Sequence, residues 1–269
     1  MPGNTKALKV RIKSVDSTLH LTKAMGLVAS SKMRKANMAM AAGRQYEQAV
    51  QSIVDLLTAV PECQGSPFMR DYKDGEKTCL IVIAGDRGLA GGYNANVFRT
   101  VRDFGGASKI IPIGKRACER FGKEIVSSEK FYAADAFKLA KQLCEEFESG
   151  EFGRLGIVMT NYVSMMTQTP EIKWVLPLAK CEKTQNTAAV FEPDERAILD
   201  VAVPEYVSGV ITACVRESFA SEVAARRMAM DSAGKNAQEM IDKLMLEYNR
   251  ARQGAITQEI TEIVAGSGS

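Results

Sequence analysis

Residues 8–40, LKVRIKSVDSTLHLTKAMGLVASSKMRKANMAM, decide the fold that we expect for this chain. Apolar or small residues recur along this stretch at alternating steps of four and three positions, and it contains no proline. A heptad pattern of this length is typical of a helix that packs along a second helix in a coiled coil. The seam positions are Leu8, Ile12, Val15, Leu19, Thr22, Gly26, Ala29, Met33, Ala36 and Met40.

The middle of this seam is made of small residues. Thr22, Gly26 and Ala29 stand where leucine would be expected in an ordinary coiled coil. Small residues allow two helix axes to approach closely, although a glycine inside a helix costs about 1 kcal/mol relative to alanine. We therefore expect the partner helix to press close at these positions. The alternative is a slight local weakening of the helix.

A second helical pattern occupies the other end of the chain. Residues 205–264 contain no proline and again carry a seam of mostly small residues. The simplest arrangement of two such helices in one chain is an intramolecular antiparallel coiled coil. The second seam consists of Ala229, Ala233, Ala237, Ile241, Leu244, Tyr248, Ala251 and Ala255.

The middle of the chain alternates between strand-like and helix-like segments. Such alternation predicts a small Rossmann-like α/β domain with a largely parallel sheet, inserted between the two long helices, so that the whole chain is of mixed α+β class. We expect strands at 78–84, 109–113, 155–159 and 172–178, and helices at 93–104, 115–121 and 134–147. The expected domains are an N-terminal helix (1–60), a linker (61–77), the α/β domain (78–192), a connector (193–204) and a C-terminal helix (205–269).

Composition excludes several classes of protein. The net charge is only +3, which does not by itself indicate nucleic-acid binding. The six cysteines are scattered without a C-x-x-C pair, so we expect reduced thiols and no structural metal. The first residues lack the apolar core of a secretory signal, and no uncharged apolar run is long enough to span a bilayer. We therefore expect a protein of a reducing compartment such as the cytosol.

A glycine-rich loop, GDRGLAGGYN at residues 85–94, follows a predicted strand and precedes a predicted helix. A loop in that place can hold a phosphate on its backbone N–H groups. Its glycine spacing, however, matches neither of the common nucleotide-binding patterns. We expect a tight turn in which Asp86 and Arg87 are available to a partner, and keep a small phosphate-binding α/β enzyme with coiled-coil arms as the alternative.

Catalytic residues are not evident in the pattern. His20 is the only histidine and lies on a helix without a nearby serine or cysteine, and no carboxylate pair stands out. Residues 1–46 carry nine basic side chains and one acidic side chain. Such a stretch could meet phosphates, anionic lipid or an acidic protein surface, or could simply be solvated. It lacks base-stacking aromatic residues, which weakens the alternative of a basic coiled-coil nucleic-acid binder.

The end of the second helix is apolar. Ile256, Ile260, Ile263 and Val264 fall largely on one side of it. If the first helix ends before this point, these residues form an exposed apolar surface, which is typical of an interface.

Several stretches resemble the gamma subunit of F-type ATP synthases, and the resemblance covers nearly the whole chain. Residues 11–36 are similar to that family's shaft helix, residues 85–94 to its central-domain loop, and residues 217–241 and 248–268 to its C-terminal helix. The resemblance implies the rotating central stalk, a subunit with no catalysis and no cofactor of its own. The implied partners are the alpha and beta subunits, the epsilon subunit and the c ring, at the cytoplasmic face of a bacterial cell membrane.

The resemblance also implies roles for individual residues. Lys23 and Met25 are expected near the same loop of a beta subunit that Arg226, Arg252, Gln253 and Thr257 contact. Ile256, Ile260, Ile263 and Val264 are expected to form the bearing tip of the shaft. Phe191, Glu192 and Asp194 are expected at the foot, near the c ring and epsilon.

Overall fold

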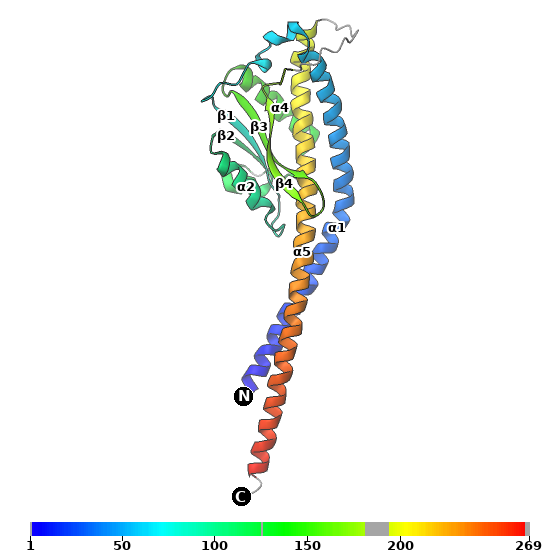
Figure 1. The fold of residues 1–269 in the computed structure, drawn as a ribbon, viewed down its shortest axis with the longest axis vertical. Coiled ribbons are helices and arrows are strands. Elements are labelled where there is room, and N and C mark those ends of the chain that lie inside the picture. The colour runs from blue at the N-terminus through cyan, green and yellow to red at the C-terminus, as the bar shows by residue number, and fades with distance from the viewer. Residues whose placement is uncertain (1, 125, 181–193, 267–269) are drawn as a thin grey trace. The chain divides into compact units, whose positions relative to one another are not determined.

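The computed structural model describes residues 2–124, 126–180 and 194–266. The chain forms two compact units, which we call the helical unit (Met1–Ser30 with Arg226–Ser269) and the sheet unit (Ser31–Ala225). Two long helices, α1 (Pro2–Thr58) and α5 (Glu195–Gly266), contribute residues to both units (Figure 1). The sheet unit therefore includes residues 31–58 of α1 and 195–225 of α5, which lie outside the α/β domain (78–192) expected from the sequence.

In the helical unit, α1 packs along its predicted seam. Leu19, Thr22 and Ala29 are buried there, whereas their neighbours Leu21 and Leu27 are exposed. On α5 the predicted Ala237 and Leu244 are buried, but Met230 and Gly234 face α1 where Ala229 and Ala233 were expected. The closest approach occurs at the small residues. A Cβ atom added to Gly26 would lie 3.6 Å from Cβ of Met230, and one added to Gly234 would lie 3.6 Å from Oγ1 of Thr22. These contacts confirm an antiparallel pair that is tight at the small-residue seam.

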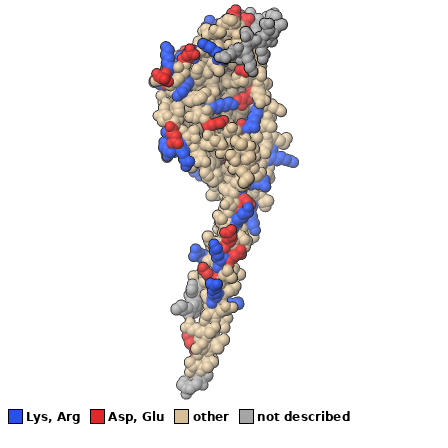
Figure 2. Space-filling model, in the orientation of Figure 1, with Lys and Arg blue, Asp and Glu red and all other residues tan. Residues whose placement is uncertain are grey.

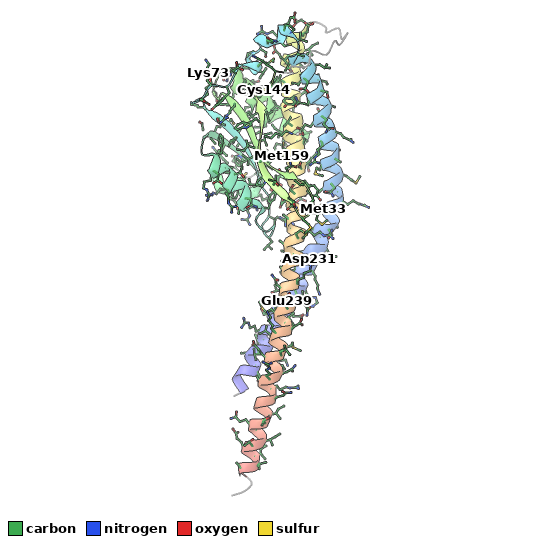
Figure 3. The ribbon with its side chains drawn as sticks, in the orientation of Figure 1. Met33, Lys73, Cys144, Met159, Asp231 and Glu239 are labelled. Atoms are coloured by element: carbon green, nitrogen blue, oxygen red, sulfur yellow. The ribbon has the colours of Figure 1, made fainter. Side chains whose placement is uncertain are left out.

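The same two helices are also antiparallel in the sheet unit. A Cβ atom added to Gly43 of α1 would lie 3.3 Å from Cα of Ala213 of α5. A Cβ atom added to Gly209 would lie 2.9 Å from Cε1 of Tyr46. The predicted seam residues Met33, Ala36 and Met40 are buried in this unit. Met33 is labelled on α1 in Figure 3. The heptad pattern of α1 therefore describes its packing in each unit.

The sheet has four strands in the order β2-β1-β3-β4. The first three strands are parallel and β4 is antiparallel to β3, which confirms the largely parallel sheet. Strand β4 begins and ends earlier than the expected 172–178, and two short 3₁₀ helices, Pro61–Gly65 and Pro67–Met69, lie in the expected linker. The strands are β1 (Thr78–Ile83), β2 (Ala107–Ile113), β3 (Arg154–Tyr162) and β4 (Gln168–Leu176), and the remaining helices are α2 (Tyr93–Phe104), α3 (Lys115–Phe121) and α4 (Ala133–Glu148).

Both faces of the sheet are covered. Every residue of β1 is buried, as expected for a strand between two layers of helix. Ile81 and its neighbours on one face pack with α4 and α5, in a core that includes Met159 (Figure 3). Leu80 and Val82 on the other face pack with α2 and α3. The main core thus lies between the sheet and the helices α1, α4 and α5.

Helix α5 begins earlier than the sequence indicated. It starts at Glu195 and continues through Pro204, so the expected connector is helical from Glu195 onward. Proline inside a helix removes one backbone hydrogen bond and usually ends or bends the helix, which is why residue 205 was the expected start. In the structure, Leu199, Val203 and Tyr206, on the turns that flank Pro204, are buried in the main core. Their burial offsets the cost of the proline.

Helix α5 also meets the length and composition of a membrane span, with a mean hydropathy of 1.6 in its most apolar window. Among the described residues no second helix meets this test, and 61% of the window is buried inside the structure. Burial of this extent is that of a core helix, because this window is already largely covered by protein.

Candidate functional site

A groove runs between α1 and α5 in the helical unit. Its volume is about 540 Å³, and it lies over Gly26 and Gly234, where the absence of side chains leaves space. Three cationic side chains and one acidic side chain line it. They are Lys23, Arg227, Lys235 and Asp231, the last of which is labelled on α5 in Figure 3. The acidic member is paired, because Nζ of Lys235 lies 2.9 Å from Oδ2 of Asp231.

The residues expected to contact a beta subunit all lie in the helical unit, but in two separate places. Lys23 is exposed on the groove, and Met25 and Arg226 are half-buried. Since Gly26 faces Met230 and Thr22 faces Gly234, these three residues lie along the same part of the helix pair. They form a first group of predicted contacts.

The second group lies further along α5. Arg252, Gln253 and Thr257 are exposed, and the hydroxyl of Thr257 donates a hydrogen bond to the carbonyl oxygen of Gln253. At 1.5 Å per residue, this group is roughly 30 Å along the axis from the point of α5 that faces Met25. The contact of both groups with one loop of a beta subunit stays a prediction, and it would require a loop that spans this distance.

The predicted tip is exposed. Ile256, Ile260, Ile263 and Val264 are 47%, 56%, 65% and 64% exposed. The register set by Gly26 and Met230 brings the start of α1, at Pro2, opposite residue 254, so α5 continues past the end of its partner. On the face shown in Figure 2, the described part of this tip is mostly uncharged. The absence of a covering helix explains why these apolar residues remain on the surface.

Of the predicted foot residues, only Asp194 is described, because Phe191 and Glu192 lie outside the described residues. Asp194 precedes α5 and accepts a hydrogen bond from the backbone N–H of Ala197 at 2.8 Å through Oδ1. This is the geometry of a helix N-cap. Asp194 therefore has a structural role at the start of α5, and its contact with a partner stays a prediction.

Asp86 of the glycine-rich loop is not available to a partner. Its carboxylate accepts hydrogen bonds from the backbone N–H groups of Lys115, Ser128 and Glu129, at 3.0, 3.0 and 3.1 Å, and from the hydroxyl of Ser127 at 2.5 Å. Burial alone would raise the pKa of Asp86, but these four hydrogen bonds outweigh it and lower the pKa below its ordinary value. The carboxylate thus connects three segments of the sheet unit, and the expectation that it faces a partner is wrong.

The glycine-rich loop is also unsuited to a phosphate. The N–H of Gly85 donates to Oδ1 of Asn94 at 2.9 Å, so that donor is already used. The carboxylate of Glu222, which is 3% exposed, packs directly on Gly85, where an added Cβ would lie 2.6 Å from Cδ. A buried carboxylate at this point would repel a phosphate. Only a glycine at position 85 leaves room for the Glu222 side chain.

The stability of the sheet unit should depend on the charge of Asp86. A folded-state pKa below the unfolded value means that its contribution is fully present above the unfolded pKa of about 3.9 and is lost as the pH falls through the lower, folded pKa. We expect Asp86→Asn to lower the denaturation midpoint at pH 7 and to flatten its acid dependence below about pH 4. Urea denaturation followed by circular dichroism at several pH values measures both. Asp74→Asn, at an exposed turn position, serves as a control, and an unchanged acid limb in Asp86→Asn would contradict the assignment.

Among the described residues, the one histidine lies at the surface and the cysteines are buried. His20 is exposed, and its Nε2 lies 3.7 Å from Oδ2 of Asp16 on the same helix. Residues 2–124, 126–180 and 194–266 contain no cluster of three or more histidine, cysteine, aspartate or glutamate side chains that could hold a metal ion. Five cysteines are buried free thiols, and Cys181 lies outside the described residues.

The sequence did not predict the ion pair between Arg44 and Glu217. Arg44 of α1 was counted only as part of a basic stretch, yet its Nη2 lies 2.6 Å from Oε1 of Glu217 of α5. Glu217 is only 7% exposed, and both residues also reach the end of strand β3. No sequence signal joins residues so far apart in the chain, although a buried glutamate on a helix seam is unusual once the seam is known.

Comparison with known proteins decides the family. The profile of the family described as ATP synthase matches residues 4–269. The ATP synthase gamma chain of Ruminococcus albus is 41% identical over 282 aligned positions, which cover 98% of each chain. The chain belongs to the ATP synthase gamma-chain family. The gamma chain of Moorella thermoacetica is 38% identical, again with 98% of each chain covered.

Solved structures share the fold of this gamma-family chain. A chain from the rotor of the Euglena gracilis mitochondrial ATP synthase aligns with a TM-score of 0.65 at 18% identity, covering 95% of this chain and all of that one. A chain from the central stalk and c-ring of the Tetrahymena thermophila enzyme aligns with a TM-score of 0.62 at 22% identity, covering 79% and 99%. At these identities the likeness concerns the fold, and it confirms a coiled coil joined to a Rossmann-like domain.

Proposed function

We propose that this chain is the rotating central stalk of an F-type ATP synthase and has no catalytic activity of its own. The observation that carries the proposal is its membership of the gamma-chain family over 98% of its length. Related folds come from structures titled as the rotor and as the central stalk with the c-ring. Ion flow would turn a membrane ring and this stalk, and the stalk would drive conformational change in neighbouring catalytic subunits.

The geometry of the helical unit suits a shaft. Gly26, Thr22 and Gly234 let two helices lie close together, which makes a narrow rod. The tip residues Ile256, Ile260 and Ile263 expose apolar surface that carries no charge to trap the rotor at one angle. Non-directional apolar contacts change little in energy as the shaft turns, whereas a hydrogen bond or ion pair would have to break. The two polar groups around Lys23 and Gln253 are the proposed points where torque passes to a beta subunit.

The proposed partners are those of a central stalk. Alpha and beta subunits would surround the helical unit, and the epsilon subunit and c ring would meet the foot near Asp194. Assembly would place the chain at the cytoplasmic face of a bacterial cell membrane, peripheral to the bilayer. No nucleic acid is required as a partner.

Purification of the assembled complex tests the proposal. We expect this chain to co-purify with alpha and beta subunits at one copy per three of each, and we expect the complex, but not the isolated chain, to hydrolyse ATP. Quantitative mass spectrometry gives the stoichiometry, and a coupled assay gives the turnover. Turnover by the purified chain alone, or its failure to join the complex, would overturn the proposal.

The alternative of a phosphate-binding enzyme makes a different prediction. It requires the loop at residues 85–94 to bind ATP or inorganic phosphate in the isolated chain. The carboxylate of Glu222 against Gly85 argues against this. Calorimetric titration of the isolated chain with ATP and with phosphate should give no heat of binding, and saturable binding would favour the enzyme.

A further inference from the structure

Strand β3 extends past the strand beside it. Strand β1 pairs with β3 only as far as Val158, which lies opposite Val82, while β3 continues to Tyr162. On the other side, β3 pairs with β4, and Thr160 lies opposite Pro170, which has no N–H group to donate. The backbone groups of Thr160 and Tyr162 therefore face the side where β1 has ended. In a buried position such groups need partners.

Side chains from the two long helices take the place of the missing strand. Ser218 accepts a hydrogen bond from the N–H of Thr160 at 3.1 Å, and Ser221 donates one to the carbonyl of Thr160 at 3.0 Å. Glu217 accepts one from the N–H of Tyr162 at 3.0 Å. All of these side chains belong to α5.

Helix α1 completes the set. The Nη2 atom of Arg44 donates to the carbonyl of Tyr162 at 3.2 Å and to Oε1 of Glu217 at 2.6 Å, while Nε donates to Oε2 of Glu217 at 3.1 Å. Both backbone groups of Thr160 and both of Tyr162 are thereby satisfied. We call Arg44, Glu217, Ser218 and Ser221 the strand-end latch.

The α5 side of the latch is buried, whereas the Arg44 side chain is partly exposed. Ser218 and Ser221 are 0% exposed, Glu217 is 7% exposed and Thr160 is 2% exposed. Hydrogen bonds to the Glu217 side chain raise the pKa of Arg44 above its ordinary value despite partial burial. Tyr93 at the start of α2 adds a hydrogen bond from its hydroxyl to the carbonyl of Ser218 at 3.0 Å. The latch thus joins α1, α5, α2 and the sheet.

Outside the latch, ion pairs join Lys173 of β4 to Glu47 of α1 and Lys32 of α1 to Glu129, and much of the contact between the sheet and α5 is apolar. Ile81, Ile157 and Met159 pack in one core with Val207, Val210 and Ile211 of α5. Close packing in this core also opposes sliding or rotation of the helix, but apolar contact is non-directional and requires no exact alignment of particular atoms. Hydrogen bonds to backbone groups at defined positions are directional and oppose such movement.

We propose that the strand-end latch carries the turning force between the α/β domain and the helix pair. The inference rests on the proposed function, because it assigns the force-bearing contact within the proposed rotor. The latch residues are positioning residues that touch no substrate. When the α/β domain is driven round, the latch makes the helices turn with it instead of slipping against the apolar core.

Variants of the assembled, membrane-reconstituted complex test this. Ser218→Ala with Ser221→Ala removes two of the hydrogen bonds, and Glu217→Gln weakens the bond to Arg44 with little change of shape. Ser208→Ala removes a similarly buried hydroxyl of α5 outside the latch and is the control. Two quantities are measured: hydrogen exchange of the Thr160 and Tyr162 amides, and ion pumping per ATP hydrolysed.

We expect exchange at Thr160 to be roughly tenfold faster in the serine variant, because its N–H loses its acceptor. We also expect both latch variants, but not Ser208→Ala, to lose ion pumping per ATP hydrolysed while ATP hydrolysis persists. If the serine variant fails to assemble, the near-isosteric Glu217→Gln carries the test.

Two outcomes overturn the proposal in distinguishable ways. Faster exchange with pumping per ATP equal to that of the wild type would show that the latch only stabilises the fold. A wild-type complex that contains the chain but shows no ATP-driven pumping would instead overturn the proposed function, and the inference with it.

Discussion

Gly114→Ala should destabilise the sheet unit by about 4 kcal/mol or more, which can prevent folding. Gly114 joins β2 to α3 with a φ of 98°, a value that disfavours residues with a Cβ atom. An added Cβ would lie 1.9 Å from the carbonyl oxygen of Ala84. That oxygen belongs to backbone that cannot move aside easily, because Ala84 is 1% exposed and its N–H donates to the carbonyl of Ile113 at 2.9 Å.

Two other glycines separate the causes of this effect. Gly122 has a φ of 63° but nothing within 4 Å of an added Cβ, so Gly122→Ala should cost only about 1 kcal/mol. Gly65 has neither a positive φ nor a neighbour within 4 Å, so Gly65→Ala should be close to neutral. Denaturation of the three variants in urea, followed by circular dichroism, ranks them. A midpoint for Gly114→Ala equal to that of Gly122→Ala would show that the clash is relieved.

Phe147→Ala should be the most damaging truncation in the main core, at about 3–5 kcal/mol. Phe147 of α4 is 0% exposed. Its ring stacks on Phe68 at a centroid distance of 6.0 Å and meets Phe152 at 5.8 Å, and Cζ of Arg70 lies 4.3 Å above it. Truncation leaves a cavity whose walls are other large side chains, and it also removes the ring beneath a cation.

A second phenylalanine of the same helix provides the control. Phe137 is 41% exposed, so Phe137→Ala removes less buried surface and leaves no enclosed cavity. We expect it to cost less than about 1.5 kcal/mol. Equilibrium unfolding in guanidinium chloride measures both variants. Equal losses would mean that the stack around Phe147 adds nothing to ordinary burial.

The coiled coil could be predicted from the sequence because its signal is local and repeated. Leu19, Thr22 and Ala29 stand at heptad positions, and burial at those positions follows from the helical period alone. The strands and helices around β1 could also be predicted, since a short apolar run and an amphipathic helix each carry their own pattern. The start of α5 could not, because the effect of Pro204 depends on how much apolar surface its neighbours bury.

The resemblance to gamma subunits pointed to the candidate contact residues, but it did not show how they are arranged. The register of α1 against α5 divides them into one group around Lys23 and another around Gln253. That division follows from helix rise and from the point where α1 begins, which no local pattern of α5 reveals.

The sequence by itself therefore determined the two long seams, the alternating α/β insert and the exposed tip, because each depends on spacing along one segment. Only the tertiary structure decided that Asp86 joins three segments within the chain, and that Arg44, Glu217, Ser218 and Ser221 complete the end of β3. These groups are brought together by packing from distant parts of the chain. Their hydrogen bonds depend on distances of a few tenths of an ångström, which a linear pattern does not contain.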